Sequence, residues 1–341
     1  MQQYDFLGIG DTTTDAFIRI KDAALHCNLD KENCEICFRF KDKVPYEDVY
    51  IVPAVGNAAN ASVTAARLGL KSAFLSNIGD DYFGEEVIKT LHGENIGTEF
   101  IISHKNRKTN YHYVLWYEDD RTILIKHEEY DYKLPYFDDP KWVYLSSLGA
   151  NSFQFHEMFE RYMNERPDVK LAFQPGTYQI KFGRKKLAGI YQRSDVFICN
   201  KEEAQRILEI NETDIKKLMR SIKELGPKIV VITDGVNGAY AYDSGSPSTD
   251  SGQNLQGKFW FMPTYPDPRP PYERTGAGDA FSSTFIVALS LGLKVEEALR
   301  WAPINSMSVV QYVGAREGLL TRAKLEKYLE DAPADYLPKA I

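Results

Sequence analysis

The stretch YERTGAGDAFSSTF, residues 272–285, places two glycines and an aspartate directly before an apolar run with helical spacing. We therefore expect the backbone N–H groups of Gly276, Ala277 and Gly278 at a helix N-terminus, where they have no intrahelical partner. Such a terminus attracts anions. Asp279 lies in the first turn of this helix, where a bound phosphate would repel its carboxylate unless the carboxylate takes part in the chemistry.

Three further motifs place polar residues where strands are expected to end. They are Asn200 and Glu203 in NKEE, Thr233, Gly235 and Gly238 in TDGVNGA, and Asp15 in GIGDTTTD. Each motif alone has an ordinary structural explanation, because Asn200 and Glu203 fit a helix capping box and Asp15 fits a turn or cap residue. Only their combination points to a functional site.

Apolar strands alternate with helical patterns along most of the chain. The strand segments lie within residues 4–11, 71–81, 141–149, 169–177, 195–208 and 227–242, with helical patterns such as 57–70 and 212–225 between them. This alternation predicts an α/β fold, a Rossmann-like and mainly parallel sheet with helices on both faces. Ligands of such sheets bind beyond the carboxyl ends of the strands, where the four motifs fall.

Two β-rich segments, about residues 16–52 and 110–129, interrupt the alternation. We expect them to form antiparallel strands that pair into one small sheet, acting as a lid over a site or as a dimer surface. This sheet would be inserted into a single domain that spans residues 1–341. Residues 243–271 are rich first in Ser and Gly and then in Pro, which predicts a surface loop.

The four cysteines leave two interpretations open. Cys27, Cys34 and Cys37 follow His26 within HCNLDKENCEIC, so four zinc ligands are available, but the adjacency of His26 and Cys27 makes simultaneous binding awkward. Reduced, partly buried thiols are therefore the preferred interpretation. Cys199 lies in an apolar strand pattern and is expected in the core.

The composition is that of an ordinary globular protein, with 341 residues, 43% hydrophobic and 26% charged. There are 41 basic and 48 acidic residues, a net charge of −7, and no long run of Lys or Arg. This balance argues against nucleic acid and for a small-molecule partner. The N-terminus shows no leader pattern, and no segment reaches the ~18 apolar residues of a membrane span, so we expect a soluble cytoplasmic protein without a membrane partner.

Taken together, the motifs resemble a known family. GNAANASVTAARLGLKSAFLSNIG at residues 56–79 and TGAGDAF at residues 275–281 resemble the two signature regions of the ribokinase-like (PfkB-type) carbohydrate and nucleoside kinases. NKEE, TDGVNGA and the terminal VGAREG follow in the family's order. The resemblance therefore runs from about residue 4 to about residue 325, and residues 21–50 fall outside it.

The resemblance implies a phosphotransferase that moves the γ-phosphate of ATP to a primary hydroxyl of a sugar. Asp279 would be the general base that takes the proton of the attacking hydroxyl. The N–H groups of Gly276, Ala277 and Gly278 would form the anion hole for the transferring phosphoryl group. Glycines suit this role because the absence of side chains allows the phosphoryl group to approach the backbone closely.

The resemblance also implies binding residues on either side of the anion hole. Asn200 and Glu203 would hold Mg²⁺ on the ATP phosphates, partly through water. The other candidates on the nucleotide side are Thr233, Gly235, Gly238, Thr275 and Asn305. On the substrate side, Asp15 would bond paired hydroxyls, and Gly56, Asn57 and Asn60 would complete the pocket.

Several positions depart from the family pattern. Pro303 stands where an adenine-facing asparagine is frequent, and Asn305 follows two residues later. Gln174 replaces a more usual aspartate and receives no role. Glu273 and Arg274 replace the common Asp-Thr or Asp-Ser, which leaves the family's monovalent cation site an open question. Arg274 is either a surface residue or a positive charge near the triphosphate that partly replaces the cation.

The substrate stays open at this point, since pentoses, hexoses, sugar acids and nucleosides are all compatible with the motifs. The main alternative is an adenosine-type nucleoside kinase, in which aromatic residues of the lid would stack on the base. Those residues are Tyr111, Tyr113, Trp116 and Tyr117. A catalytically silent sugar sensor is disfavoured because Asp279, Asn200 and Glu203 are all present. A Rossmann dehydrogenase is disfavoured because Thr13 stands where the last glycine of its fingerprint belongs.

Overall fold

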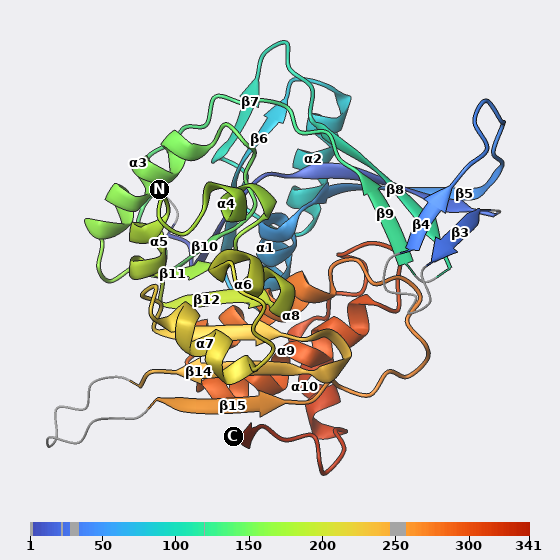
Figure 1. The fold of residues 1–341 in the computed structure, drawn as a ribbon. Helices are drawn as coiled ribbons and strands as arrows, with labels where there is room; N and C mark the ends of the chain where they lie inside the picture. The colour runs from blue at the N-terminus through green and yellow to red at the C-terminus, as the bar shows by residue number, and fades with distance from the viewer. Residues whose placement is uncertain (1–2, 22, 28–33, 119, 246–256) are drawn as a thin grey trace, which may run out of the picture.

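The computed structural model describes residues 3–21, 23–27, 34–118, 120–245 and 257–341. Its centre is a ten-stranded sheet in the order β16-β15-β14-β13-β12-β11-β10-β1-β6-β7. The seven strands from β13 to β7 are parallel, and β14, β15 and β16 add antiparallel strands at one edge (Figure 1). The predicted mainly parallel sheet is therefore confirmed.

Apart from β7 and β16, which were not predicted from the sequence, the strands fall where the apolar runs predict them, with one exception. The parallel strands are β1 (Phe6–Ile9), β6 (Ser72–Gly79), β7 (Ile101–His104), β10 (Trp142–Leu145), β11 (Lys170–Phe173), β12 (Val196–Asn200) and β13 (Ile229–Thr233), and the antiparallel ones are β14 (Ala239–Asp243), β15 (Lys258–Met262) and β16 (Lys339–Ala340). The exception is β15, because it lies inside the segment predicted as a surface loop. Its aromatic and apolar residues pair with β14, an interaction that the flanking Ser, Gly and Pro residues concealed.

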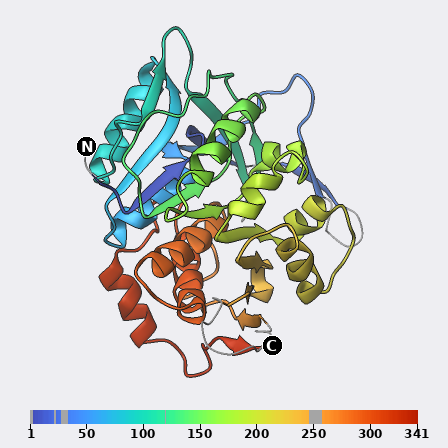
Figure 2. The same ribbon diagram turned by 90° about the vertical axis from the view of Figure 1, so that its left-hand side faces the viewer.

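Helices cover both faces of the sheet, as Figures 1 and 2 show. One face packs against α1 (Asn57–Arg67), α2 (Tyr82–Gly93), α8 (Ala277–Ser290), α9 (Val295–Val309) and α10 (Arg322–Glu330). The other packs against α3 (Phe153–Asn164), α4 (Thr177–Phe182), α5 (Ala188–Arg193), α6 (Lys201–Leu208) and α7 (Ile215–Lys223). Successive residues of β1 serve the two cores, Phe6 the first and Leu7 the second, because strand side chains alternate between faces.

The two β-rich segments meet in a separate sheet, here called the lid sheet, which projects from the α/β body in Figure 1. Its strands are β2 (Thr13–Ile20), β5 (Tyr46–Val55), β8 (Asn110–Tyr117) and β9 (Asp120–Leu124). The pairs β2–β5 and β8–β9 are antiparallel, as predicted, whereas the central pair β2–β8 is parallel. Segments far apart in sequence thus build one small sheet beside the strand ends.

The cysteine segment forms a short hairpin, β3 (Ala24–Cys27) and β4 (Cys34–Cys37), outside the lid sheet. The side chains of Cys27 and Cys34 lie outside the described residues, so the zinc hypothesis concerns a part of the chain that the structure does not describe. Cys37 is half-buried with a free thiol, and Cys199 is buried in the core as predicted. Within the described ranges, no helix has both the length and the apolarity needed to cross a membrane.

Candidate active site

The GAGD segment begins helix α8 as the sequence predicts. Gly276 is the N-cap residue, with φ of +82°, and a Cβ there would lie 2.5 Å from the Cα of Ala315. Only glycine suits this position, because the backbone is left-handed and the neighbouring chain is close. A Cβ on Gly278 would meet no atom within 4 Å, so the first turn of α8 faces open space.

Asp279 lies in that first turn, half-buried, and is held by side chains from two other elements. The amide Nδ2 of Asn60, on α1, donates to its Oδ2 at 2.9 Å, and Gln174 makes a second hydrogen bond. Burial raises the pKa of Asp279 to about 6, although both hydrogen bonds and the positive charge of Arg121 act to lower it. A carboxylate with a pKa near neutrality is well suited to accept a proton.

A cavity of about 340 Å³ lies beside the α8 terminus. Thr233, Gly235 and Gly238 line it at the end of β13, and Ala277 and Gly278 line it from α8. Its remaining walls are largely apolar and include Phe281, Pro303, Met307 and Val310. An apolar cavity next to free N–H groups can hold a flat ring with an anionic tail.

Two of the residues proposed for the nucleotide side, Thr275 and Asn305, are not among those that line this cavity. Asn305 is completely buried, donates to Thr284 Oγ1 at 2.8 Å and accepts from the backbone N of Leu320 at 2.9 Å. It ties α9 to its neighbours and does not line the cavity. Thr275 hydrogen-bonds through its backbone N and its hydroxyl to Glu273 Oε1, at 2.8 and 2.6 Å.

Asn200 and Glu203 form the capping box of α6. Asn200 Oδ1 accepts from the backbone N of Glu203 at 2.7 Å, and Glu203 Oε2 accepts from the backbone N of Asn200 at 2.9 Å. Burial raises the pKa of Glu203, and the negative charge of Asp279 adds to the effect. The second carboxylate oxygen of Glu203 takes no part in the capping box. A cation held near the carboxylates of Glu203 and Asp279 would relieve the repulsion between them.

On the other side of Asp279, the lid sheet contributes Asp15. Asp15 of β2 and His112 of β8 are direct neighbours in the sheet register, and the Nδ1 of His112 lies 3.4 Å from the Oδ1 of Asp15. Gly56 is the N-cap residue of α1, where φ is +124° and a Cβ would lie 2.6 Å from the carbonyl oxygen of Asp11. Asn57 begins α1, so these predicted residues gather at one edge of the sheet.

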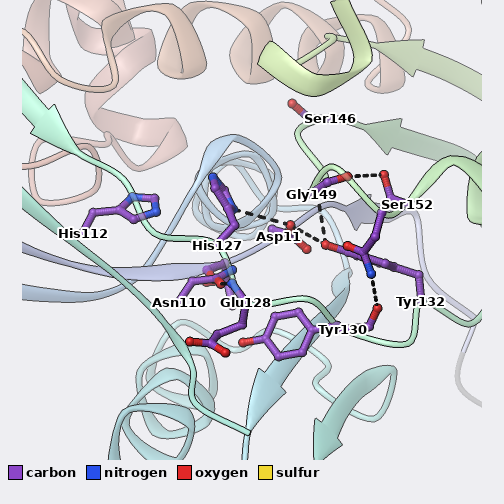
Figure 3. A network of polar contacts seen from close by, with 12 residues as sticks. Asp11, Asn110, His112, His127, Glu128, Tyr130, Tyr132, Ser146, Gly149 and Ser152 are labelled. Atoms are coloured by element: carbon purple, nitrogen blue, oxygen red, sulfur yellow. Dashed lines mark hydrogen bonds and ion pairs between the residues drawn. The ribbon is translucent and has the colours of Figure 1, made fainter. Parts of the chain in front are cut away.

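The structure adds residues that sequence reasoning did not single out (Figure 3). Asp11, four residues before Asp15, accepts from Tyr132 Oη at 2.7 Å, and His127 Nδ1 lies 4.0 Å from its Oδ2. Tyr132 in turn accepts from the backbone N of Gly149 at 3.0 Å. Asp11 stood within a motif that we quoted, but no local pattern connects it with His127.

Glu273 is the most unexpected residue of the site, since its side chain is completely buried. Besides binding Thr275, it lies 3.7 Å from the Nε of Arg121, which comes from β9 of the lid sheet. Arg274 is exposed and lines the 340 Å³ cavity. The two residues that break the family pattern thus have different environments, one paired to the lid and one facing the cavity.

The lid aromatics lie mostly in packing contacts. Trp116 is buried, donates to the carbonyl of Glu118 at 2.8 Å and contacts Tyr272 edge to face. Tyr111 and Tyr113 lie near Phe83 at the start of α2, around a second cavity of about 500 Å³. Trp116 is therefore a packing residue of the lid sheet, whereas Tyr111 and Tyr113 line the second cavity.

The fold and the site define a class of protein, an α/β protein in which a glycine-containing helix terminus lies between an apolar cavity and a small lid sheet with polar residues. The sequence profile of the pfkB family carbohydrate kinases matches residues 31–322, and this chain belongs to that family. It is a phosphotransferase of the sugar kinase type.

Known relatives cover most of the chain. A 5-dehydro-2-deoxygluconokinase of Halalkalibacterium halodurans is 23% identical over 81% of this chain and 85% of its own. A ribokinase of Bacillus subtilis is 25% identical over 80% of this chain and 87% of its own. The structure of Arabidopsis thaliana ribokinase complexed with ribose and ATP aligns with a TM-score of 0.75 and 19% identity, covering 96% of this chain and 99% of that one. At 19% identity, the similarity to the Arabidopsis thaliana ribokinase structure shows a shared fold.

Proposed function

We propose that this protein transfers the γ-phosphate of ATP to a primary hydroxyl of a sugar, with Asp279 as the general base. The observation that carries the proposal is the position of Asp279, half-buried in the first turn of α8 beside a cavity of nucleotide size. Its pKa of about 6 leaves it ionised at neutral pH and still basic enough to accept a hydroxyl proton.

The residues divide the work of the transfer. Asn60 and Gln174 hold the Asp279 carboxylate in place by hydrogen bonds, which orients it for the acceptor hydroxyl. The N–H groups of the α8 terminus, Gly276 to Gly278, stabilise the charge on the transferring phosphoryl group. Open space at Gly278 lets that group approach the backbone.

The nucleotide would occupy the 340 Å³ cavity, with Thr233 and Gly235 near its phosphates and sugar. The described residues contain no cluster of three or more metal-ligating side chains. A magnesium ion would therefore be held mainly by the phosphates and water, with Asn200 and Glu203 completing its shell, which suits the preference of this ion for retained water. When bound, Mg²⁺ neutralises phosphate charge.

The test is a screen of purified protein with ATP and Mg²⁺ against pentoses, hexoses, sugar acids and nucleosides, following ADP release. Clear turnover of a sugar supports the proposal. Turnover of nucleosides alone would replace it with the nucleoside kinase alternative. If no compound causes ADP release although ATP still binds, the catalytic role is contradicted and a non-catalytic sugar sensor is favoured.

We further propose that a second copy of the chain packs against the outer face of the lid sheet. Ile51, Tyr113 and Leu124 lie in one cross-strand row of that face, with 58%, 49% and 51% of their surfaces exposed. An apolar row of this kind suits an interface. Light scattering of wild type and Ile51→Lys checks it: a dimer that dissociates in the variant is expected, and a monomeric wild type contradicts it.

A further inference from the structure

Two aspartate–histidine pairs lie on the acceptor side of the site, Asp15 with His112 and Asp11 with His127. Asp11 follows β1 and Asp15 lies on β2, whereas His112 lies on β8 and His127 in the segment that follows β9. The rings of His112 and His127 contact each other edge to face with centroids 5.3 Å apart. The two pairs therefore adjoin through their histidines, and are together called the acceptor surface here; Figure 3 shows His112, His127 and Asp11.

Buried polar atoms of this surface lack hydrogen-bond partners among the described residues. They are Asp11 Oδ1, Asp15 Oδ1, Asn60 Oδ1, His112 Nε2 and His127 Nδ1. Only 7% of Asp11 and of Asp15 is exposed, and 2% of Asn60. Native proteins seldom leave buried polar atoms unsatisfied, so such a group of atoms indicates a place for a polar ligand. Asn60 also donates to Asp279, which connects this surface to the reaction centre.

The charges of the surface show which ligand it accepts. Burial raises the pKa of Asp11 to about 7, even though Tyr132, the Gly149 N–H and His112 stabilise the charged form. Burial, reinforced by the positive charge of His112, lowers the pKa of His127 to about 4, so this ring is neutral at physiological pH. The surface itself holds the carboxylates of Asp11 and Asp15 and adjoins that of Asp279, so an acceptor that carries its own anionic group would be repelled.

We propose that the two Asp–His pairs bind the hydroxyl groups of an uncharged polyhydroxy acceptor and reject acceptors that carry a carboxylate or a phosphate. Carboxylate oxygens accept from sugar hydroxyls, and the neutral ring of His127 can donate or accept. This inference rests on the proposed function and narrows it. It also separates this chain from the 5-dehydro-2-deoxygluconokinases among its relatives, whose name refers to a sugar acid.

The test compares matched acceptors with the wild-type protein, ATP and Mg²⁺: D-ribose with D-ribonate, D-fructose with D-fructose 6-phosphate, and 2-deoxy-D-glucose with 2-deoxy-D-gluconate. We expect kcat/KM for the best neutral compound to exceed that of every charged one at least tenfold. A charged compound that is used equally well or better overturns the inference while leaving the kinase function intact.

Calorimetric titration of the same compounds separates the two proposals. If no ADP is released with any compound, the proposed function fails, and binding then decides the inference by itself. Tighter binding of neutral compounds supports it. Binding of charged compounds alone, or of none, overturns it.

The variant Asp11→Asn keeps the shape of the side chain and removes its charge. We expect the KM for the neutral acceptor to rise at least tenfold and the KM for ATP to stay unchanged. The ratio of kcat/KM between the neutral acceptor and its charged counterpart should decrease. Asp131→Asn is the matched control, because Asp131 is an exposed aspartate in the segment that carries His127 and Tyr132, paired with Lys133 at 2.8 Å. An unchanged acceptor KM and preference in Asp11→Asn overturn the inference, and the wild-type comparison decides it if that variant does not fold.

Discussion

The two halves of the site, on either side of Asp279, are built in different ways. The nucleotide half, which comprises the α8 terminus and the 340 Å³ cavity, relies on backbone groups, glycines and apolar walls. The proposed acceptor half comprises Asp11, Asp15, Asn60, His112 and His127, and relies on buried or half-buried charged and polar side chains. A phosphate chain is bound by N–H dipoles that one short segment provides, whereas hydroxyl groups at several positions require side chains from several elements.

The difference also separates what each half tolerates. In the nucleotide half, activity should depend on the shape of the backbone, so a single methyl group added at a glycine should strongly reduce stability or turnover. In the acceptor half, charge and hydrogen bonding decide, so substitutions that preserve shape should still be costly. The following substitutions test that distinction, from the largest expected effect to the smallest.

Asp279→Asn removes the carboxylate that we propose as the general base, between the two halves. We expect turnover to fall by about 10²–10⁴-fold, the usual contribution of general base catalysis, with nucleotide affinity preserved. Steady-state kinetics and a nucleotide titration measure the two quantities. Turnover within tenfold of the wild type would show that Asp279 is not the base.

Gly276→Ala and Gly278→Ala form a matched pair in the nucleotide half. At Gly276 the left-handed φ and the contact with Ala315 should lower the free energy of unfolding by about 1–3 kcal/mol. Gly278→Ala has open space and should gain up to about 1 kcal/mol from helix propensity. Its methyl group should nevertheless reduce turnover, by up to about 10²-fold, because small misplacements of the reacting group are costly.

Chemical denaturation and kinetics of both variants check this pair. Equal stabilities would mean that the tight contact at Gly276 is wrong. Full turnover by Gly278→Ala would mean that the phosphoryl group does not approach the first turn of α8.

Asp15→Asn tests the acceptor half with little change of shape. We expect the KM for the sugar to rise about 10- to 100-fold, because a hydrogen bond to a charged group contributes about 1.5–3 kcal/mol. The KM for ATP should stay within twofold. An unchanged sugar KM would remove Asp15 from the acceptor site.

The pH dependence tests the connection between the halves. A general base must be ionised, so kcat/KM of the wild type should fall about tenfold per pH unit below the Asp279 pKa of about 6. Asn60→Leu removes a hydrogen bond that lowers this pKa, so the acid limb should move to higher pH. A limb that stays in place or moves to lower pH would show that Asn60 does not act on Asp279.

Much of the fold followed from local patterns in the sequence. Alternating apolar strands and helices predicted the parallel sheet with its two helical layers, because periodicity depends on which face of each element is buried. Strand β15 was missed because its neighbours in sequence are typical of loops, and its pairing with β14 involves a partner beyond that loop. The parallel pairing of β2 with β8 could not be predicted either, since nothing local sets the direction of strands so far apart.

The candidate site likewise combines features that the sequence predicts with features that only the tertiary structure reveals. The sequence by itself determined the α8 terminus, the capping box at Asn200 and the presence of Asp279 and Asp15, because each is a short motif with local geometry. Tertiary structure alone decided that Gln174 contacts Asp279, that Asn305 is buried, that Arg121 reaches Glu273, and that Asp11 and His127 face each other. Backbone conformation depends on neighbours in the chain, whereas burial and charge pairing depend on which distant segments the folded sheet brings together.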